Sequence, residues 1–156
     1  MTSSRSTCFC PGSLPAPTLF LYGPDGGGLL KLWLADGSKI AFRLYGRHVR
    51  VLLSLNNALC MDKDLDEAAR GWMSDERIAE AYACGDPRVL PPTREAITAY
   101  RAQINRLIRQ ETPSGLETPR LFATQRCVGV RLAQAITVID LRERRRDGES
   151  PMVSPS

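Results

Sequence analysis

The stretch "TREAITAYRAQINRLIRQE", residues 93–111, has the clearest helical pattern in the chain. Thr93 suits the N-cap position, where its side chain can accept a hydrogen bond from the first turn, and Glu95 suits the positive end of the helix. An apolar stripe recurs at helical spacing, with Tyr100 at its margin, and consists of Ile97, Ile104, Leu107 and Ile108. The pattern predicts an amphipathic helix over residues 93–110.

The opposite face of this helix is polar and basic. The residues of this face recur at helical spacing and are Thr98, Arg101, Ala102, Asn105 and Arg109. Gln103 and Arg106 lie beside them. A guanidinium group can pair with a guanine edge or a phosphate, and an Asn or Gln side chain can make two hydrogen bonds to adenine. Such a face suits the major groove of DNA, but an arginine-rich face that is merely solvated has the same pattern.

A β-hairpin is expected directly after this helix. Beyond a loop rich in Pro and Gly, the chain reads "FATQRCVGVRL" over residues 122–132, with β-forming residues on both sides of Arg126 and Cys127. An arginine at a hairpin turn has little use in a core, and it can enter a minor groove, where the potential is most negative. We therefore expect a wing over residues 120–132 that carries Arg126 toward DNA.

The residues before this helix predict a small sheet and two further helices. Three β-rich runs, separated by strong turn signals, predict an antiparallel meander over residues 18–22, 29–34 and 39–44. One apolar stripe then predicts a helix, and its residues are Tyr45, Val49, Leu52 and Leu53. Ser74 is the expected N-cap of the next helix, which begins with Asp75 and Glu76 and ends near Gly85.

This order of elements predicts an α+β fold. The architecture is a winged helix-turn-helix with an N-terminal antiparallel β-sheet, a three-helix core and a C-terminal β-hairpin wing. We expect a disordered tail over residues 1–17, the DNA-binding domain over 18–133, and a C-terminal extension over 134–156 that is basic and then disordered. His48, the only histidine, is expected to be exposed on its helix.

Over roughly residues 18–133 the chain resembles the DNA-binding domain of OmpR/PhoB-type response regulators. The family's third helix follows a pattern close to V-D-V-H-I-x-x-L-R-x-K-L, and "ITAYRAQINRLI" places Ile97, Ile104 and Ile108 on its apolar positions. The family's hairpin is close to T-V-R-G-x-G-Y-R-L, and "TQRCVGVRL" matches it at Thr124, Arg126, Gly129, Arg131 and Leu132. The stretches "KIAFRLYGRHVRVLLSLNNA" and "WMSDERIAEAYA" fit the preceding strand and helices.

The resemblance implies how the chain would contact DNA. The residues at positions that face DNA in the family are Tyr100, Ala102, Gln103 and Asn105. Thr124 would contact a phosphate and Arg126 would enter the minor groove. The implied partners are double-stranded DNA, a second copy arranged head to tail on direct repeats, and RNA polymerase. The implied function is sequence-specific DNA binding by a transcriptional regulator, and no receiver domain is expected beside the winged helix.

Some positions depart from the family pattern. Arg101 stands where the family prefers an apolar residue, which favours an outward Arg101 and an inward Tyr100. Cys127 replaces a glycine at the wing turn and can change its geometry. Ala102, Gln103 and Asn105 replace positions that are often arginine. The alternative function is therefore a degenerate winged helix that acts as a protein–protein interaction module.

Composition narrows the remaining function classes. The chain has 156 residues, a net charge of +4 and no apolar run near the roughly 18 residues of a transmembrane helix, so we expect a cytoplasmic protein without a membrane partner. Five scattered cysteines argue against a secreted disulfide framework, and a metal site built on Cys8 and Cys10 is disfavoured because no second pair has matching spacing. No cofactor is expected. One histidine and no set of nucleophile, base and oxyanion donors predict that the chain is not an enzyme.

Overall fold

The computed structural model describes residues 14–22, 26–83 and 88–142, in which a strand meander precedes three helices and a hairpin. The strands are β1 (Thr18–Leu21), β2 (Gly28–Trp33), β3 (Lys39–Leu44), β4 (Phe122–Gln125), β5 (Gly129–Leu132) and β6 (Thr137–Asp140). The helices are α1 (Gly46–Met61), the 3-10 helix η2 (Glu67–Ala69), α2 (Asp75–Tyr82) and α3 (Arg94–Glu111). The predicted α+β class is correct, and the three predicted N-terminal runs coincide with β1 to β3.

Four strands form the larger sheet, in the order β3-β2-β1-β6. The pairs β1–β2 and β2–β3 are antiparallel, as a meander requires. Side chains alternate along β3, so that Ile40, Phe42 and Leu44 are buried while the residues between them are exposed. One face of the sheet therefore belongs to the core.

The strand β6 was not predicted, and it comes from the expected C-terminal extension. It pairs with β1 in parallel, with Thr18 opposite Thr137 and Leu21 opposite Asp140. The side chain of Asn56 in α1 holds Ile136, the residue before β6. Its amide N–H donates to the Ile136 carbonyl at 3.1 Å, and its oxygen accepts from the Ile136 N–H at 2.9 Å. The fold thus continues past residue 133, where the sequence placed the domain boundary. Of the expected N-terminal tail over 1–17, residues 1–13, with Cys8 and Cys10, lie outside the described residues, and so do residues 143–156 of the expected extension over 134–156.

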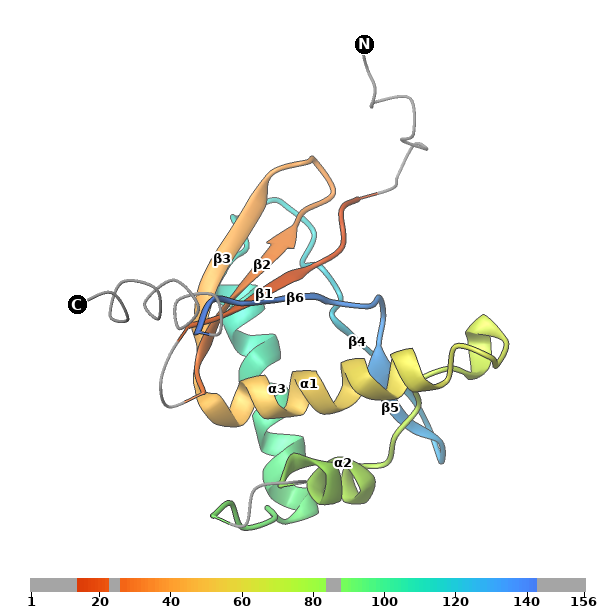
Figure 1. Ribbon diagram of the computed structural model, residues 1–156. Coiled ribbons are helices and arrows are strands. Elements are labelled where there is room, and N and C mark those ends of the chain that lie inside the picture. The colour runs from red at the N-terminus through yellow and green to blue at the C-terminus, as the bar shows by residue number, and fades with distance from the viewer. Residues whose placement is uncertain (1–13, 23–25, 84–87, 143–156) are drawn as a thin grey trace, which may run out of the picture.

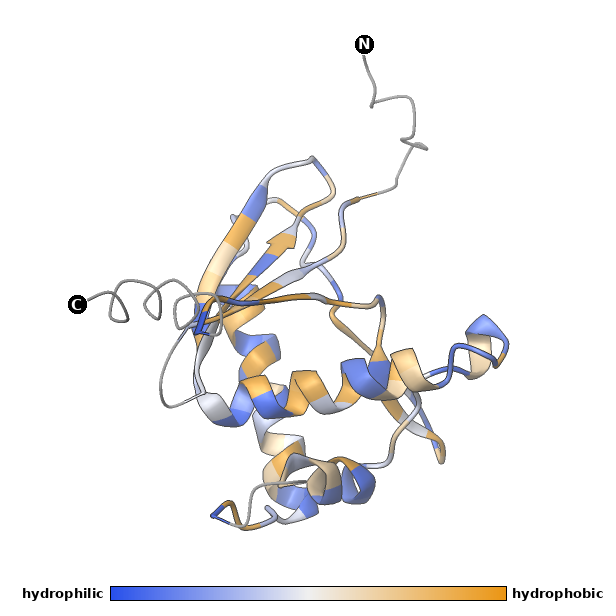
Figure 2. Cartoon of the chain, in the orientation of Figure 1, coloured by the Kyte–Doolittle hydropathy of each residue, from blue (hydrophilic) through white to orange (hydrophobic). Residues whose placement is uncertain are grey.

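The helices bury their apolar stripes against one another and against the sheet. Figure 1 shows α1 crossing α3 between the four-stranded sheet and α2, while α3 runs from the sheet toward α2. Apolar and hydrophilic residues alternate along α1 and α3 (Figure 2), as expected of helices with one buried face. The predicted stripe of α3 is buried at Ile97, Ile104 and Ile108.

The β4–β5 hairpin is attached to the segment before α2. Met73 and Val130 form an antiparallel bridge in which each backbone N–H donates to the other residue's carbonyl at 2.9 Å. Beside this bridge, Gly129 has a φ of 136°, and a Cβ added there would clash with the Met73 carbonyl oxygen. Only glycine fits at this position without a backbone shift.

Replacement of Gly129 by alanine is expected to lower the free energy of unfolding by about 2 kcal/mol or more, because the new methyl meets rigid backbone at an unfavourable φ. Gly37→Ala is the matched control, since Gly37 has a φ of 90° and no atom within 4 Å of the place that a Cβ would take. It should lose only the backbone contribution, about 1 kcal/mol. Equal losses in urea unfolding of the two variants would contradict this account.

Candidate nucleic-acid interface

The exposed side of α3 carries a row of polar and cationic side chains. Thr93 caps the helix, as predicted, by accepting a hydrogen bond from the Ala96 N–H at 3.1 Å. Ala102, Arg106 and Arg109 are exposed on this side, and Asn105 is half-buried at its margin. Within the described part of the chain, the side chains of Asn105, Arg106 and Arg109 make no hydrogen bond or ion pair. They are available to a partner.

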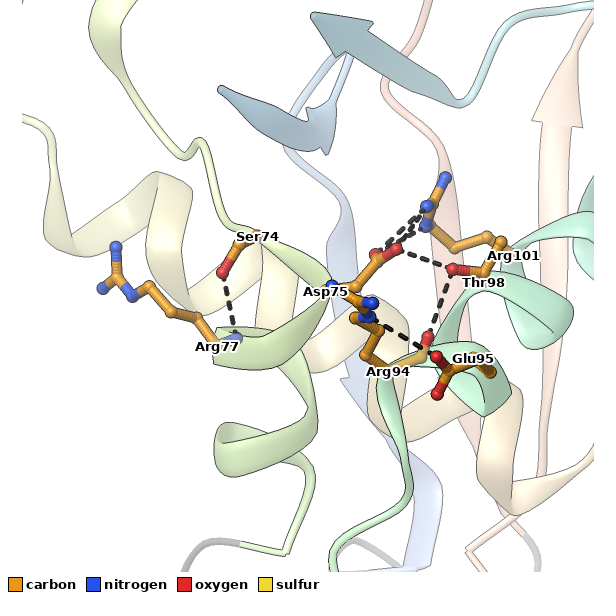
Figure 3. Close-up of polar contacts among 7 residues, drawn as sticks. All are labelled: Ser74, Asp75, Arg77, Arg94, Glu95, Thr98 and Arg101. Carbon is orange, nitrogen blue, oxygen red and sulfur yellow. Dashed lines mark hydrogen bonds and ion pairs between the residues drawn. The ribbon is translucent and has the colours of Figure 1, made fainter. Parts of the chain in front are cut away.

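Arg101 does not face outward as expected. Its guanidinium group grips Asp75 in the first turn of α2, with Nη2 at 3.0 Å from both carboxylate oxygens and Nε at 3.3 Å from Oδ1 (Figure 3). The two side chains expose only 16% and 20% of their surface. Arg101 neutralises Asp75 and fixes α3 against α2.

Thr98 takes part in the same contact. Its hydroxyl lies 2.7 Å from Asp75 Oδ2 and 3.1 Å from the Arg94 carbonyl oxygen (Figure 3). Ser74 caps α2, as predicted, by accepting from the Arg77 N–H at 3.1 Å, so Asp75 sits on a fixed first turn. Thr98 and Arg101 therefore orient α3.

Gln103 and Tyr100 lie on the other flank of α3, toward α1. The Gln103 Oε1 atom lies 2.8 Å from Nε2 of His48, and the Arg47 Nε–H donates to it at 3.4 Å. His48 is 2% exposed, so its predicted exposure was wrong. Its Nδ1 accepts from the Tyr45 N–H at 3.3 Å, which leaves the proton of a neutral imidazole on Nε2, facing Gln103. The Gln103 oxygen is thus already occupied.

Tyr100 packs within an aromatic cluster between the three helices. Its ring stacks on Tyr82 with 6.2 Å between centroids and meets His48 edge-on at 6.3 Å. The Arg47 guanidinium lies over Tyr100 at 5.9 Å, and burial raises the pKa of the Tyr82 hydroxyl. Tyr100 is half-buried, and its inward position agrees with the periodicity of α3.

The hairpin presents Thr124 of β4 and Arg126 of its turn to solvent. The Val128 N–H donates to the Gln125 carbonyl at 3.0 Å, so Arg126 and Cys127 are the central residues of the turn. Cys127 has a φ of 65° and is the one non-glycine residue with positive φ among those described. A negative φ followed by a positive one is the pattern of a type II turn, whose third residue is usually Gly or Asn. Cys127, which stands where the resembled family has a glycine, therefore keeps the backbone conformation that glycine usually adopts.

The hairpin and the two helices enclose a concave surface of about 400 Å³. Its lining includes Asp75 and Glu76 of α2, Arg94 and Arg101 of α3, and Thr124 and Gln125 of the hairpin. From the sequence, Asp75 was expected only at a helix terminus, and no pattern pointed to Gln125. Asp75 and Arg101 are 26 residues apart, so no spacing within one element could have revealed their contact.

The comparisons give no relative for this chain. Neither a protein-family model, nor a curated protein, nor a solved structure matches it. Within the described residues, no helix has the length and apolar character needed to cross a membrane, and no three His, Cys, Asp or Glu side chains are grouped as metal ligands.

The Asp75–Arg101 pair should show a coupling energy of about 1–2 kcal/mol in a double-mutant cycle, because it is bidentate and mostly buried. The cycle uses Asp75→Asn, Arg101→Gln and the double variant, with urea unfolding as the measurement. The exposed Arg94–Glu95 pair, at 3.5 Å, is the control and should couple by less than about 0.5 kcal/mol. Similar coupling in both pairs would show that the geometry of Arg101 adds nothing.

His48 should lower the free energy of unfolding at acidic pH. Burial, the largest effect, lowers its pKa below the usual 6.5 despite the hydrogen bond to Gln103. The folded state then favours the neutral ring, so this stability is complete above pH 6.5 and is lost as the pH falls through the lowered pKa. In an NMR titration, the single imidazole should have its midpoint below pH 6.5.

The variant His48→Gln isolates this effect, because the chain has no other histidine. In urea unfolding, the wild type should lose its stability advantage over the variant as the pH falls from above 6.5 through the lowered pKa of His48. A difference that stays constant over this range, or an imidazole that titrates at or above pH 6.5, would contradict the assignment.

Proposed function

We propose that this chain binds double-stranded DNA sequence-specifically, as a winged helix-turn-helix transcriptional regulator. In this arrangement α3 enters the major groove and the β4–β5 hairpin reaches the adjacent minor groove. The observation that carries the proposal is the unpaired row Asn105, Arg106 and Arg109 on α3, on a helix whose neighbouring hairpin exposes Arg126. A rigidly held helix with free base-reading and phosphate-binding groups is what groove recognition requires.

The contacts on each flank of α3 divide the expected site residues into two groups. Asn105 is the candidate for a two-bond contact with adenine, while Arg106 and Arg109 can pair with guanine or phosphate. The exposed methyl of Ala102 suits an apolar contact with thymine. The residues that are already engaged, and so set the orientation of α3, are Thr98, Tyr100, Arg101 and Gln103.

Electrostatics favour an anionic partner on this face. Asp75 would repel phosphate, but Arg101 neutralises it at 3.0 Å. The arginines at positions 106, 109 and 126 are exposed, and the net charge of the chain is +4. Each arginine that contacts a phosphate displaces condensed counterions, so the affinity should fall as salt rises.

Selection from a random duplex DNA pool should enrich one sequence family, and sites used by two copies would appear as direct repeats. On the enriched duplex, Arg126→Ala should weaken binding across sequences and reduce the salt slope by about 1. Asn105→Ala should instead change the preference at one base pair by about 1–3 kcal/mol. Both effects are measured by fluorescence anisotropy at several salt concentrations.

The control is Lys39→Ala, which removes one positive charge from an exposed position on β3. It matches Arg126→Ala in charge and should leave DNA affinity nearly unchanged. Failure of the pool to enrich any sequence, together with binding that does not depend on salt, would overturn the proposal. The same face would then be assigned to a protein partner.

A further inference from the structure

A second concave surface lies at the base of the hairpin, away from the α3 row. It is a pocket of about 590 Å³ between the end of α1, the loop that carries η2, and β5. Its polar lining includes Lys63, Glu67, Arg70 and Arg131. Its apolar lining includes Leu59, Leu132 and Ala135, and Cys60 lies among them.

The charge of this pocket is unbalanced toward positive. Three cationic side chains line it against the single carboxylate of Glu67. Lys63 is exposed and, within the described part of the chain, makes no hydrogen bond or ion pair. The Arg70 Nε–H donates to the Leu65 carbonyl at 2.7 Å, which fixes that side chain without neutralising its charge.

Arg131 is the half-buried cation of the pocket, and within the described residues its contacts are all with neutral groups. Its Nη1 donates to the carbonyls of Glu67 at 2.7 Å and Arg70 at 3.2 Å, and its guanidinium lies 4.8 Å from the centre of the Trp72 ring. Its Nε atom is buried and has no hydrogen-bond acceptor among the described residues. A guanidinium with an unsatisfied donor and no carboxylate partner is incompletely compensated, and an anion is the ligand that would compensate it.

We propose that this pocket binds a small organic oxyanion, a phosphate or carboxylate on an apolar body. Lys63 and Arg70 would hold the anionic group from the open side, and Arg131 would attract it from beneath. The volume exceeds what a bare phosphate needs, and Leu59, Leu132 and Ala135 supply an apolar wall for the remainder of the ligand. This site does not depend on the DNA-binding proposal.

The structure supplies an optical probe for occupancy. The chain has two tryptophans, and Trp72 lies against Arg131 while Trp33 lies on β2. In a Trp33→Phe background, phenyl phosphate should change the fluorescence of Trp72 saturably, with a dissociation constant below about 1 mM. Phenol and sodium chloride, at matched concentration and ionic strength, should give no saturable change. Inorganic phosphate should bind at least several-fold more weakly than phenyl phosphate.

Two variants test which residues bind the anion. Lys63→Gln changes an exposed side chain and should leave the unfolding curve unchanged. It should lower the affinity for phenyl phosphate at least fivefold. Lys39→Gln removes one positive charge from the sheet and should leave the affinity for phenyl phosphate unchanged. The absence of saturable binding up to 10 mM phenyl phosphate, or equal affinity in the Lys63→Gln variant, would overturn the proposal.

Thiol protection gives an independent measurement. Cys60 lines the pocket, whereas Cys127 is exposed at the hairpin turn, and both thiols are free. Saturating phenyl phosphate should slow the alkylation of Cys60 by iodoacetamide and leave that of Cys127 unchanged, as followed by peptide mass spectrometry. Equal rates with and without the ligand would count against the site. Displacement of phenyl phosphate by duplex DNA, with weaker DNA binding by Lys63→Gln, would assign the pocket to a DNA phosphate and overturn the small-molecule proposal.

Discussion

The rotation of α3 about its own axis is the constraint on which the rest of the molecule depends. Burial of Ile97, Ile104 and Ile108 removes three large apolar side chains from water, which stabilises one orientation by several kcal/mol. A different rotation would expose this stripe and bury arginines, so the core decides which side chains face solvent. Ala102, Arg106 and Arg109 are exposed because these isoleucines are buried.

Polar contacts on both flanks of α3 further restrict the orientation that burial of the apolar stripe sets. On one flank Arg101 grips Asp75, and on the other Gln103 meets the buried His48. Each contact uses a side chain that the DNA-binding proposal would otherwise make available to a base, and together the contacts restrict the rotation of the helix. A recognition helix gains more from a fixed orientation than from one extra flexible contact, because base readout depends on the placement of each donor and acceptor.

The sequence predicted the features that depend on local patterns. The helix over 93–110, its Thr93 cap, the hairpin and the three N-terminal strands all follow from periodicity and turn residues within one segment. It could not predict features that depend on contacts between distant segments. The four-residue strand β6 is held by β1 and Asn56, His48 is covered by α3, and Arg101 pairs with a residue of another helix. None of these partners is near in sequence.

The hairpin is positioned by a different set of contacts from those that position α3. Its base is fixed by the Met73–Val130 bridge and by Arg131, which reaches the carbonyls of the η2 segment, while its turn is fixed by the backbone of Cys127. Asp75 and His48 contact neither β4 nor β5 through their side chains in the described hydrogen bonds. An anion in the pocket would therefore contact Arg131 of β5, and the pocket lining contains no residue of α3. Under the DNA-binding proposal, such a ligand would lie beside the hairpin that carries Arg126 and would not contact Asn105.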